Sequence, residues 1–295
     1  MKRTILATTA LVTCGSMAAA DVSLSGSAEI GVVGGSGEDA QIHRDARVSF
    51  GMSGETDTGL SFGTSLALRH AGKYQDNGAE GAIHISGVFG TLTVGNTDGA
   101  FDKAMLEVPA GTSINDASTG HSGWNGNSGL DSGGEIVRYD YSIGDISLAL
   151  STQGEREGHM EAHGIGVGWS GDFAGASLGL GAGHQTSEMS SITGASLSVG
   201  LADGLSFGIT MSNTSVDGGN DKSHAGAGLS YALGDVTFAI NGGQNKEDGM
   251  DNMSGVGFAA SYSLGEGATF QIGAGSSKEG ESSSNSWSAG IALSF

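Results

Sequence analysis

The chain ends on the stretch SWSAGIALSF, residues 286–295, in which every second side chain is apolar. Small residues occupy the positions between the apolar ones, which are Trp287, Ala289, Ile291, Leu293 and Phe295. Apolar residues that recur with a period of two indicate a β-strand with one apolar face. Because chain ends usually fray into polar tails, this patterned, aromatic-tipped end predicts a strand that pairs with other strands.

The same alternation recurs along the chain, and we count sixteen such segments. An even number of antiparallel strands returns both chain ends to one rim, so the last segment can pair with the first. The sequence therefore predicts an all-β fold, a 16-stranded antiparallel transmembrane β-barrel. The segments are 22–32, 46–52, 60–68, 83–85, 92–94, 137–141, 146–150, 165–169, 178–180, 197–201, 205–211, 227–231, 236–240, 256–262, 270–272 and 287–293.

The connectors between these segments alternate in length. Short turns such as 87–90 and 233–235 follow the even segments. Longer polar connectors follow odd segments, at 34–44, 154–162, 213–223 and 275–284. This segregation is typical of an outer-membrane barrel. Aromatic residues near the short turns predict an aromatic girdle at that rim, formed by Phe62, Phe89, Tyr141, Trp169, Phe207, Tyr231, Phe238, Tyr262 and Phe270.

Residues 1–20, MKRTILATTALVTCGSMAAA, have a basic start, an apolar middle and small residues at the end. This pattern predicts a secretory signal peptide that is cleaved between Ala20 and Asp21. Cys14 leaves a lipoprotein as the alternative, although the residue before it fits lipoprotein processing badly. We therefore expect one barrel domain over residues 21–295, without a cysteine.

The amino-acid composition limits the classes of function that this chain can have. The chain has 55 glycines, only 37% apolar residues and a net charge of −20. No internal run approaches the ~18 apolar residues of a membrane helix. Without residues 1–20, ten basic residues stand against 32 acidic ones. This acidity argues against nucleic-acid binding and fits an aqueous lumen that attracts cations, so we predict weak cation selectivity.

One connector is far longer than the rest. About forty residues without alternation separate Val94 from Val137, and a loop of that length in a compact fold is usually functional. Its first part places Phe101 and Met105 at helical spacing before Pro109. We predict that this third long loop folds into the lumen.

Five stretches of the chain resemble the general-diffusion porins of Rhodobacter-type alphaproteobacteria, which are Gram-negative bacteria. The resemblance covers essentially all of residues 21–295. It implies a homotrimeric outer-membrane channel for passive diffusion of small hydrophilic solutes, with a constriction loop at about 96–134. It also implies that the outer-membrane assembly machinery reads Phe295. The stretches are DVSLSGSAEIGV (21–32), RDARVSFGMSGETDTGLSFGTSLALRH (44–70), ISGVFGTLTVGNTDGA (85–100), EIVRYDYSIGDISLALS (135–151) and SAGIALSF (288–295).

A passive pore needs charges at its constriction that set size and ion preference. Strand parity places Arg47, Arg69 and Arg138 on the lumen-facing side. Our hypothesis is that these arginines face carboxylates of the long loop across the pore. The alternative is local pairing, for example of Arg138 with Asp140 or of Arg47 with Asp45. The loop carboxylates are Asp98, Asp102, Glu107, Asp116 and Asp131.

Acidic residues in other connectors leave two interpretations open, because they could bind calcium or simply solvate a surface. No EF-hand spacing occurs among them, so we expect no metal site or other cofactor apart from this calcium alternative. These acidic residues are Glu38, Asp39, Asp217, Asp221, Glu247, Asp248 and Asp251.

Catalytic signals are weak. The pattern Gly-x-Ser-x-Gly occurs at 59–63 and 204–208, but each copy opens a predicted strand, whereas a nucleophile elbow needs a helix there. We therefore expect no enzyme. The alternative to a channel is an exported, Gly/Ser-rich adhesin-like protein, which should repeat with a fixed period and need not end on an aromatic residue.

Overall fold

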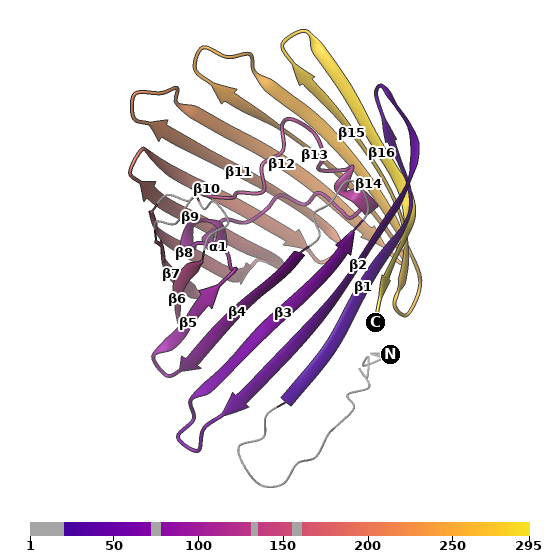
Figure 1. Ribbon diagram of the computed structural model, residues 1–295. Helices are drawn as coiled ribbons and strands as arrows, with labels where there is room; N and C mark the ends of the chain where they lie inside the picture. The colour runs from indigo at the N-terminus through magenta and orange to yellow at the C-terminus, as the bar shows by residue number, and fades with distance from the viewer. Residues whose placement is uncertain (1–20, 72–77, 131–134, 155–160) are drawn as a thin grey trace.

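The computed structural model describes residues 21–71, 78–130, 135–154 and 161–295. In these residues sixteen antiparallel strands form one closed barrel (Figure 1), so the predicted fold is confirmed. The strands are β1 (Asp21–Gly35), β2 (Glu38–Glu55), β3 (Ser61–Ala71), β4 (Gly78–Gly87), β5 (Gly90–Gly95), β6 (Ile136–Ile143), β7 (Ile146–Gln153), β8 (Ala162–Phe173), β9 (Ala176–Ser187), β10 (Ser190–Leu201), β11 (Leu205–Val216), β12 (Lys222–Leu233), β13 (Val236–Glu247), β14 (Met253–Gly265), β15 (Ala268–Glu279) and β16 (Ser282–Ser294).

The last strand closes the barrel. β16 pairs with β15 on one side and with β1 on the other, where Ile30 lies opposite Ile291. The Phe295 N–H donates to the Gly26 carbonyl at 2.9 Å, and the Gly26 N–H donates back at 3.2 Å. Hydrocarbon offers no water to an unpaired backbone group, so a strand-built span must close in this way. The proposed cleavage point before Asp21 borders residues 1–20, which lie outside the described residues.

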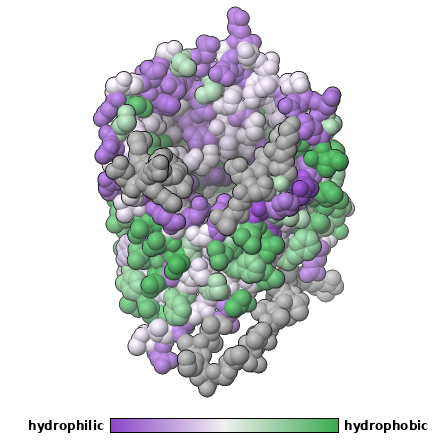
Figure 2. Space-filling view, in the orientation of Figure 1, coloured by the Kyte–Doolittle hydropathy of each residue, from purple (hydrophilic) through white to green (hydrophobic). Residues whose placement is uncertain are grey.

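The barrel has an apolar outer face and a lumen lined by small residues. Large apolar side chains such as Leu68, Leu180 and Ile240 are exposed on the outer face. They gather in a band towards the short-turn end, and polar residues cover the hairpins at the other end (Figure 2). This inside-out distribution suits a wall with lipid outside and water inside.

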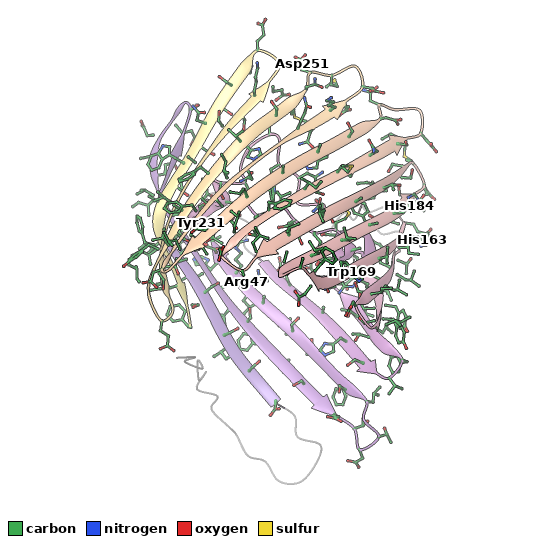
Figure 3. The ribbon with its side chains drawn as sticks, turned by 180° about the vertical axis from the view of Figure 1, so that it is seen from behind. Arg47, His163, Trp169, His184, Tyr231 and Asp251 are labelled. Carbon is green, nitrogen blue, oxygen red and sulfur yellow. The ribbon has the colours of Figure 1, made fainter. Side chains whose placement is uncertain are left out.

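Aromatic residues mark the short-turn rim. Tyr231 lies opposite Phe238 across β12 and β13, and Tyr262 lies opposite Phe270 across β14 and β15. Tyr231 is close to its short turn, whereas Asp251 lies at a hairpin tip at the far end of the barrel (Figure 3). Such rings sit well at a membrane interface because they combine an apolar body with a polar edge or hydroxyl.

Three of the four predicted long connectors, 34–44, 213–223 and 275–284, are mostly strand, and for these the prediction was wrong. The fourth, 154–162, falls between β7 and β8 and lies largely outside the described residues. Only residues 36–37 separate β1 from β2, and only residues 280–281 separate β15 from β16. The connector between β11 and β12 shrinks to residues 217–221. Backbone pairing does not depend on side-chain polarity. The ladders therefore continue beyond the apolar band, where both faces are polar and the alternation disappears.

The long connector runs from Asn96 to Glu135, between β5 and β6. It contains a short helix, α1 (Ala100–Ala104), and a single 3-10 turn, η1 (Ile114–Asp116). The helix is shorter than the apolar spacing suggested, but Phe101 and Met105 are both buried and pack against Ile192 of β10.

Among the described residues, no helix has the length and apolar character needed to cross a membrane.

Glycines of the wall allow the loop to lie directly on its inner face (Figure 1). Each of these glycines alternates with lipid-facing residues and so points inward. A Cβ there would overlap a loop backbone atom. The close contacts join Gly166 to the Ala100 carbonyl, Gly181 to the Ala104 carbonyl, Gly228 to the Pro109 carbonyl, Gly243 to the Gly123 carbonyl and Gly257 to the Ser118 carbonyl.

We predict that Gly181→Ala destabilises the barrel by about 1–3 kcal/mol, because the added methyl group forces the loop off the wall. Gly154→Ala is the matched control, since a Cβ there meets no atom of the described residues within 4 Å. Thermal unfolding of the protein in detergent, followed by circular dichroism, measures both variants. Equal midpoints for the two variants would contradict the contact.

Candidate functional site

Charged residues concentrate on the part of the inner wall formed by β2–β6. Arg47 on β2 and Arg69 on β3 lie directly opposite each other in the strand register. Both alternate with lipid-facing residues, Val48 and Leu68, and so point into the lumen. Arg138 on β6 points inward in the same way and lies opposite Thr93 of β5.

The positive charge of each of the two opposed guanidinium groups is compensated by a carboxylate. Arg47 Nη2 lies 2.9 Å from Glu80 Oε2, and both side chains are about half exposed. Arg69 contacts Asp45 twice through Oδ2, from Nη2 at 2.6 Å and from Nε at 2.9 Å. Like charges directly opposite each other on a sheet repel, so these carboxylates stabilise the pair. Asp45 therefore pairs with Arg69, whereas the local-pairing alternative assigned it to Arg47.

Arg138 connects the wall to the beginning of the loop. Its Nε contacts both carboxylate oxygens of Asp140, at 3.0 and 3.1 Å. Its Nη1 donates to the Thr97 hydroxyl at 2.9 Å and to the Asp98 carbonyl at 2.6 Å. Arg138 is only 8% exposed. It pairs locally, as the alternative suggested, and also holds the first loop residues in place.

The structure describes four of the five loop carboxylates. Asp98, Glu107 and Asp116 are exposed, and Asp102 is partly buried. Asp131 lies outside the described residues. The surrounding protein partly desolvates the Glu107 carboxyl and thereby raises its pKa, and the negative charges of Asp98 and then Asp116 raise it further. Asp98 and Asp116 thus act electrostatically on Glu107, although they precede and follow it by nine residues in the sequence.

Polar side chains of the wall hold the loop, and sequence analysis missed them. The Ser151 and Ser196 hydroxyls accept the N–H groups of Ala100 and Leu106, at 2.8 and 2.7 Å. Gln185, which is fully buried, accepts the Leu130 N–H at 2.7 Å. The only sequence signal for these residues was an amide or hydroxyl at an inward position among glycines.

Two wall amides, that of the buried Asn241 and that of the partly buried Asn245, hold the middle of the loop. Asn241 Nδ2 donates to the Ser118 carbonyl at 2.7 Å, and its Oδ1 lies 2.6 Å from Nε2 of His121. Asn245 Nδ2 donates to the Ser122 carbonyl at 2.8 Å. A buried polar group is costly unless it is hydrogen-bonded, so these contacts fix the loop in one position along the wall.

No group of three or more His, Cys, Asp or Glu side chains in the described residues is arranged to hold a metal ion. Among the acidic connector residues, Glu38, Asp221 and Glu247 have protein partners. Glu247 pairs with Lys222 at 3.3 Å, Asp221 Oδ1 accepts the Val216 N–H at 3.0 Å, and Glu38 Oε2 accepts the Gln41 side-chain amide at 2.9 Å. Calcium binding at these connectors stays a prediction.

Comparison with known proteins identifies the chain. A family model described as Gram-negative porin matches residues 7–282. The chain belongs to the Gram-negative porin family. A porin of Rhodobacter capsulatus is 28% identical over 286 residues, which cover 84% of this chain and 92% of that protein. The resemblance inferred from the sequence is therefore confirmed.

Solved structures share the fold. A porin structure refined at 1.8 Å superimposes with a TM-score of 0.73 at 22% identity, covering 93% of this chain and 100% of that chain. A triple mutant of Rhodopseudomonas blastica porin superimposes with a TM-score of 0.69 at 21% identity, with the same coverage. The protein is thus an outer-membrane porin that forms a channel, and the adhesin-like alternative is not supported. The family is one of channels rather than of enzymes.

The raised pKa of Glu107 predicts how ion preference in this porin depends on pH. On acidification a carboxyl with a raised pKa loses its charge before ordinary carboxyls do. Glu107→Gln should therefore remove the earliest decline in cation preference between about pH 7 and pH 4. Reversal potentials in a salt gradient measure this decline. Glu281→Gln, at a hairpin tip, is the matched control, and identical profiles for the two variants would contradict the prediction.

Proposed function

We propose that this porin mediates passive diffusion of small hydrophilic solutes and ions, with a weak preference for cations. Its constriction is formed by the loop at about 96–134 and by the wall that carries Arg47, Arg69 and Arg138. The charge balance supports this proposal. Each of these three arginines has a carboxylate partner on the wall. By sequence, the loop adds five carboxylates and one lysine, Lys103, and the carboxylates are Asp98, Asp102, Glu107, Asp116 and Asp131.

A constriction with a surplus of negative charge raises the local concentration of cations and lowers that of anions. The effect is weak, because exposed charges are screened beyond a Debye length of ~8 Å at physiological salt. We propose no resident cofactor for this passive transport. Passive transport does not require calcium at the acidic connectors.

Removal of two wall arginines tests the constriction. The double variant Arg47→Ala and Arg69→Ala should widen the pore and leave Asp45 and Glu80 uncompensated. We expect higher single-channel conductance and stronger cation preference in planar bilayers. Arg44→Ala is the control, since Arg44 lies on the same strand, opposite the lipid-facing Ile30. If the double variant conducts and selects like the wild type, Arg47 and Arg69 do not line the constriction.

We also propose that the porin is a homotrimer, surrounded by outer-membrane lipid, and that the assembly machinery reads Phe295. Phe295 is 79% exposed, while its backbone is paired with Gly26. The ring is therefore accessible on a strand end of fixed position, which suits recognition by another protein.

Gel migration tests both assignments. Unboiled outer-membrane extracts should contain an oligomer band that boiling converts to monomer. Deletion of Phe295 should reduce the amount of this band severalfold and leave the conductance of the assembled channels unchanged. Phe295→Tyr keeps an aromatic ring and is expected to assemble normally. A monomer that is soluble without detergent would contradict the trimer, and normal assembly of the deletion would contradict the role of Phe295.

A further inference from the structure

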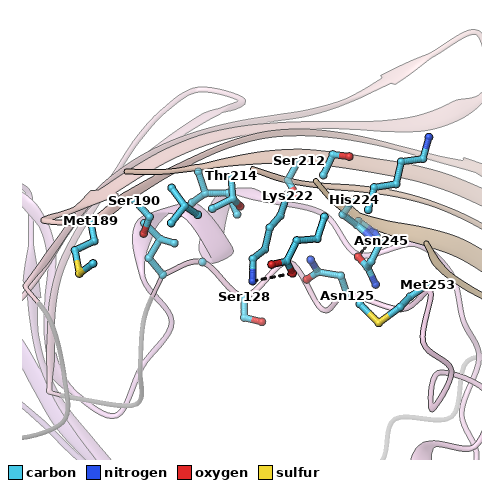
Figure 4. Close-up of a pocket in the computed structure, with 17 residues that line it drawn as sticks. Asn125, Ser128, Met189, Ser190, Ser212, Thr214, Lys222, His224, Asn245 and Met253 are labelled. Atoms are coloured by element: carbon cyan, nitrogen blue, oxygen red, sulfur yellow. Dashed lines mark hydrogen bonds and ion pairs between the residues drawn. The ribbon is translucent and has the colours of Figure 1, made fainter. Parts of the chain in front are cut away.

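A cavity of about 510 Å³ lies on the lumen side of the wall, away from the proposed constriction arginines. The end of the loop, at Asn125 and Ser128–Leu130, forms one side of the cavity, and strands β10–β14 form the other (Figure 4). Small-molecule sites in proteins usually have volumes of ~300–1,000 Å³ and are mainly apolar, with a few polar groups. The cavity has this size and this kind of lining.

One part of the cavity is apolar, in contrast to the small polar residues that line much of the lumen. Leu130, Met189 and Ile192 contribute to this part. Ile192 is only 5% exposed and packs on Phe101 and Met105, and Leu130 packs against the same cluster. The apolar part of the cavity therefore packs on the buried contact between the loop and the wall.

Another part of the cavity carries an ion pair. Lys222 Nζ lies 3.3 Å from Glu247 Oε2, and the two residues face each other at the ends of β12 and β13 (Figure 4). Their side chains are 55% and 28% exposed. An ammonium group has three donors and a carboxylate has two acceptor oxygens. One mutual contact thus leaves both groups with capacity for a ligand.

Stability does not explain this pair well, because exposed ion pairs contribute only about 0–1 kcal/mol. The wall beneath it is ordered by other contacts. His224 Nδ1 lies 2.8 Å from Asn245 Oδ1, and the Asn245 amide holds the loop through Ser122. A cation and an anion are therefore presented side by side, next to an apolar surface, on a fixed part of the wall.

We propose that this cavity binds small zwitterions with an apolar side chain, such as apolar α-amino acids. The solute carboxylate lies on Lys222 Nζ, its ammonium group lies on Glu247, and its side chain covers Leu130, Met189 and Ile192. Binding is weak, since a channel must release what it admits. The inference rests on the channel function and adds a class of solute to it.

L-Phenylalanine is a suitable probe in planar bilayers, because a zwitterion adds no conducting ions. We expect a saturable decrease in wild-type current as its concentration rises. Loss of a charged hydrogen-bond donor typically weakens binding about tenfold or more, so Lys222→Met should raise the half-saturating concentration by at least that factor. Glu247→Gln should act in the same direction, which provides a second test if the first variant does not assemble.

Lys278→Met is the matched control. It removes the same charge from the same end of the barrel, but Lys278 lies opposite Ser254 on the outward-facing side of β15 and does not line the cavity. Glycine, which has both charges without a side chain, and benzyl alcohol, which has a ring without charges, should give no saturable decrease.

Three outcomes would overturn the site and leave the channel function intact. The first is a wild-type channel that conducts salt but does not respond to phenylalanine. The second is an equal decrease in current with glycine and with phenylalanine. The third is an equal shift of the half-saturating phenylalanine concentration in Lys222→Met and Lys278→Met. A protein that inserts and carries no current at all would instead refute the channel function itself. Failure of the site and failure of the porin are therefore distinguishable.

Discussion

The structure depends on one constraint, which is that every backbone N–H and C=O inside hydrocarbon needs a partner within the protein. The pairing of β1 with β16 meets this constraint at the seam of the barrel, where the two neighbouring strands are not consecutive in the sequence. An apolar patterned C-terminus follows directly, because the last strand must both face lipid and bond to the first. Closure also creates a lumen. The channel therefore follows from the need to pair every backbone N–H and C=O group inside hydrocarbon.

A second requirement is a loop that stays in one place inside that lumen. Fixing a loop of this length costs conformational entropy for every residue it orders. Glycines such as Gly181 and Gly228 offset part of that cost, because they let the loop backbone reach van der Waals contact with the wall. Amides such as Gln185 and Asn241 then satisfy its buried polar groups. The many glycines therefore have two effects, because they bring the loop into contact with the wall and also leave the lumen open.

Charge is distributed unevenly between loop and wall. The wall arginines are matched by Glu80, Asp45 and Asp140, which limits their effect on a passing ion. In the loop, partial desolvation and the negative charges of Asp98 and Asp116 raise the pKa of Glu107, so the ionised form of this carboxyl is disfavoured. Lys222 and Glu247 lie apart from both groups and border a different surface, an apolar hollow of the wall. One lumen therefore offers a charged passage and a separate amphipathic site.

The sequence by itself determined the strand count, the face of each side chain and the closure of the barrel, because a period of two is a local property of extended backbone. It also placed Arg47, Arg69 and Arg138 on the lumen side. Only the tertiary structure decided that Arg69 pairs with Asp45 and Arg47 with Glu80, and that the polar connectors continue as strands. Side-chain partners depend on strand register and on the course of the loop. Both are set by contacts between residues far apart in the chain, as between Gly257 and Ser118, which no local pattern encodes.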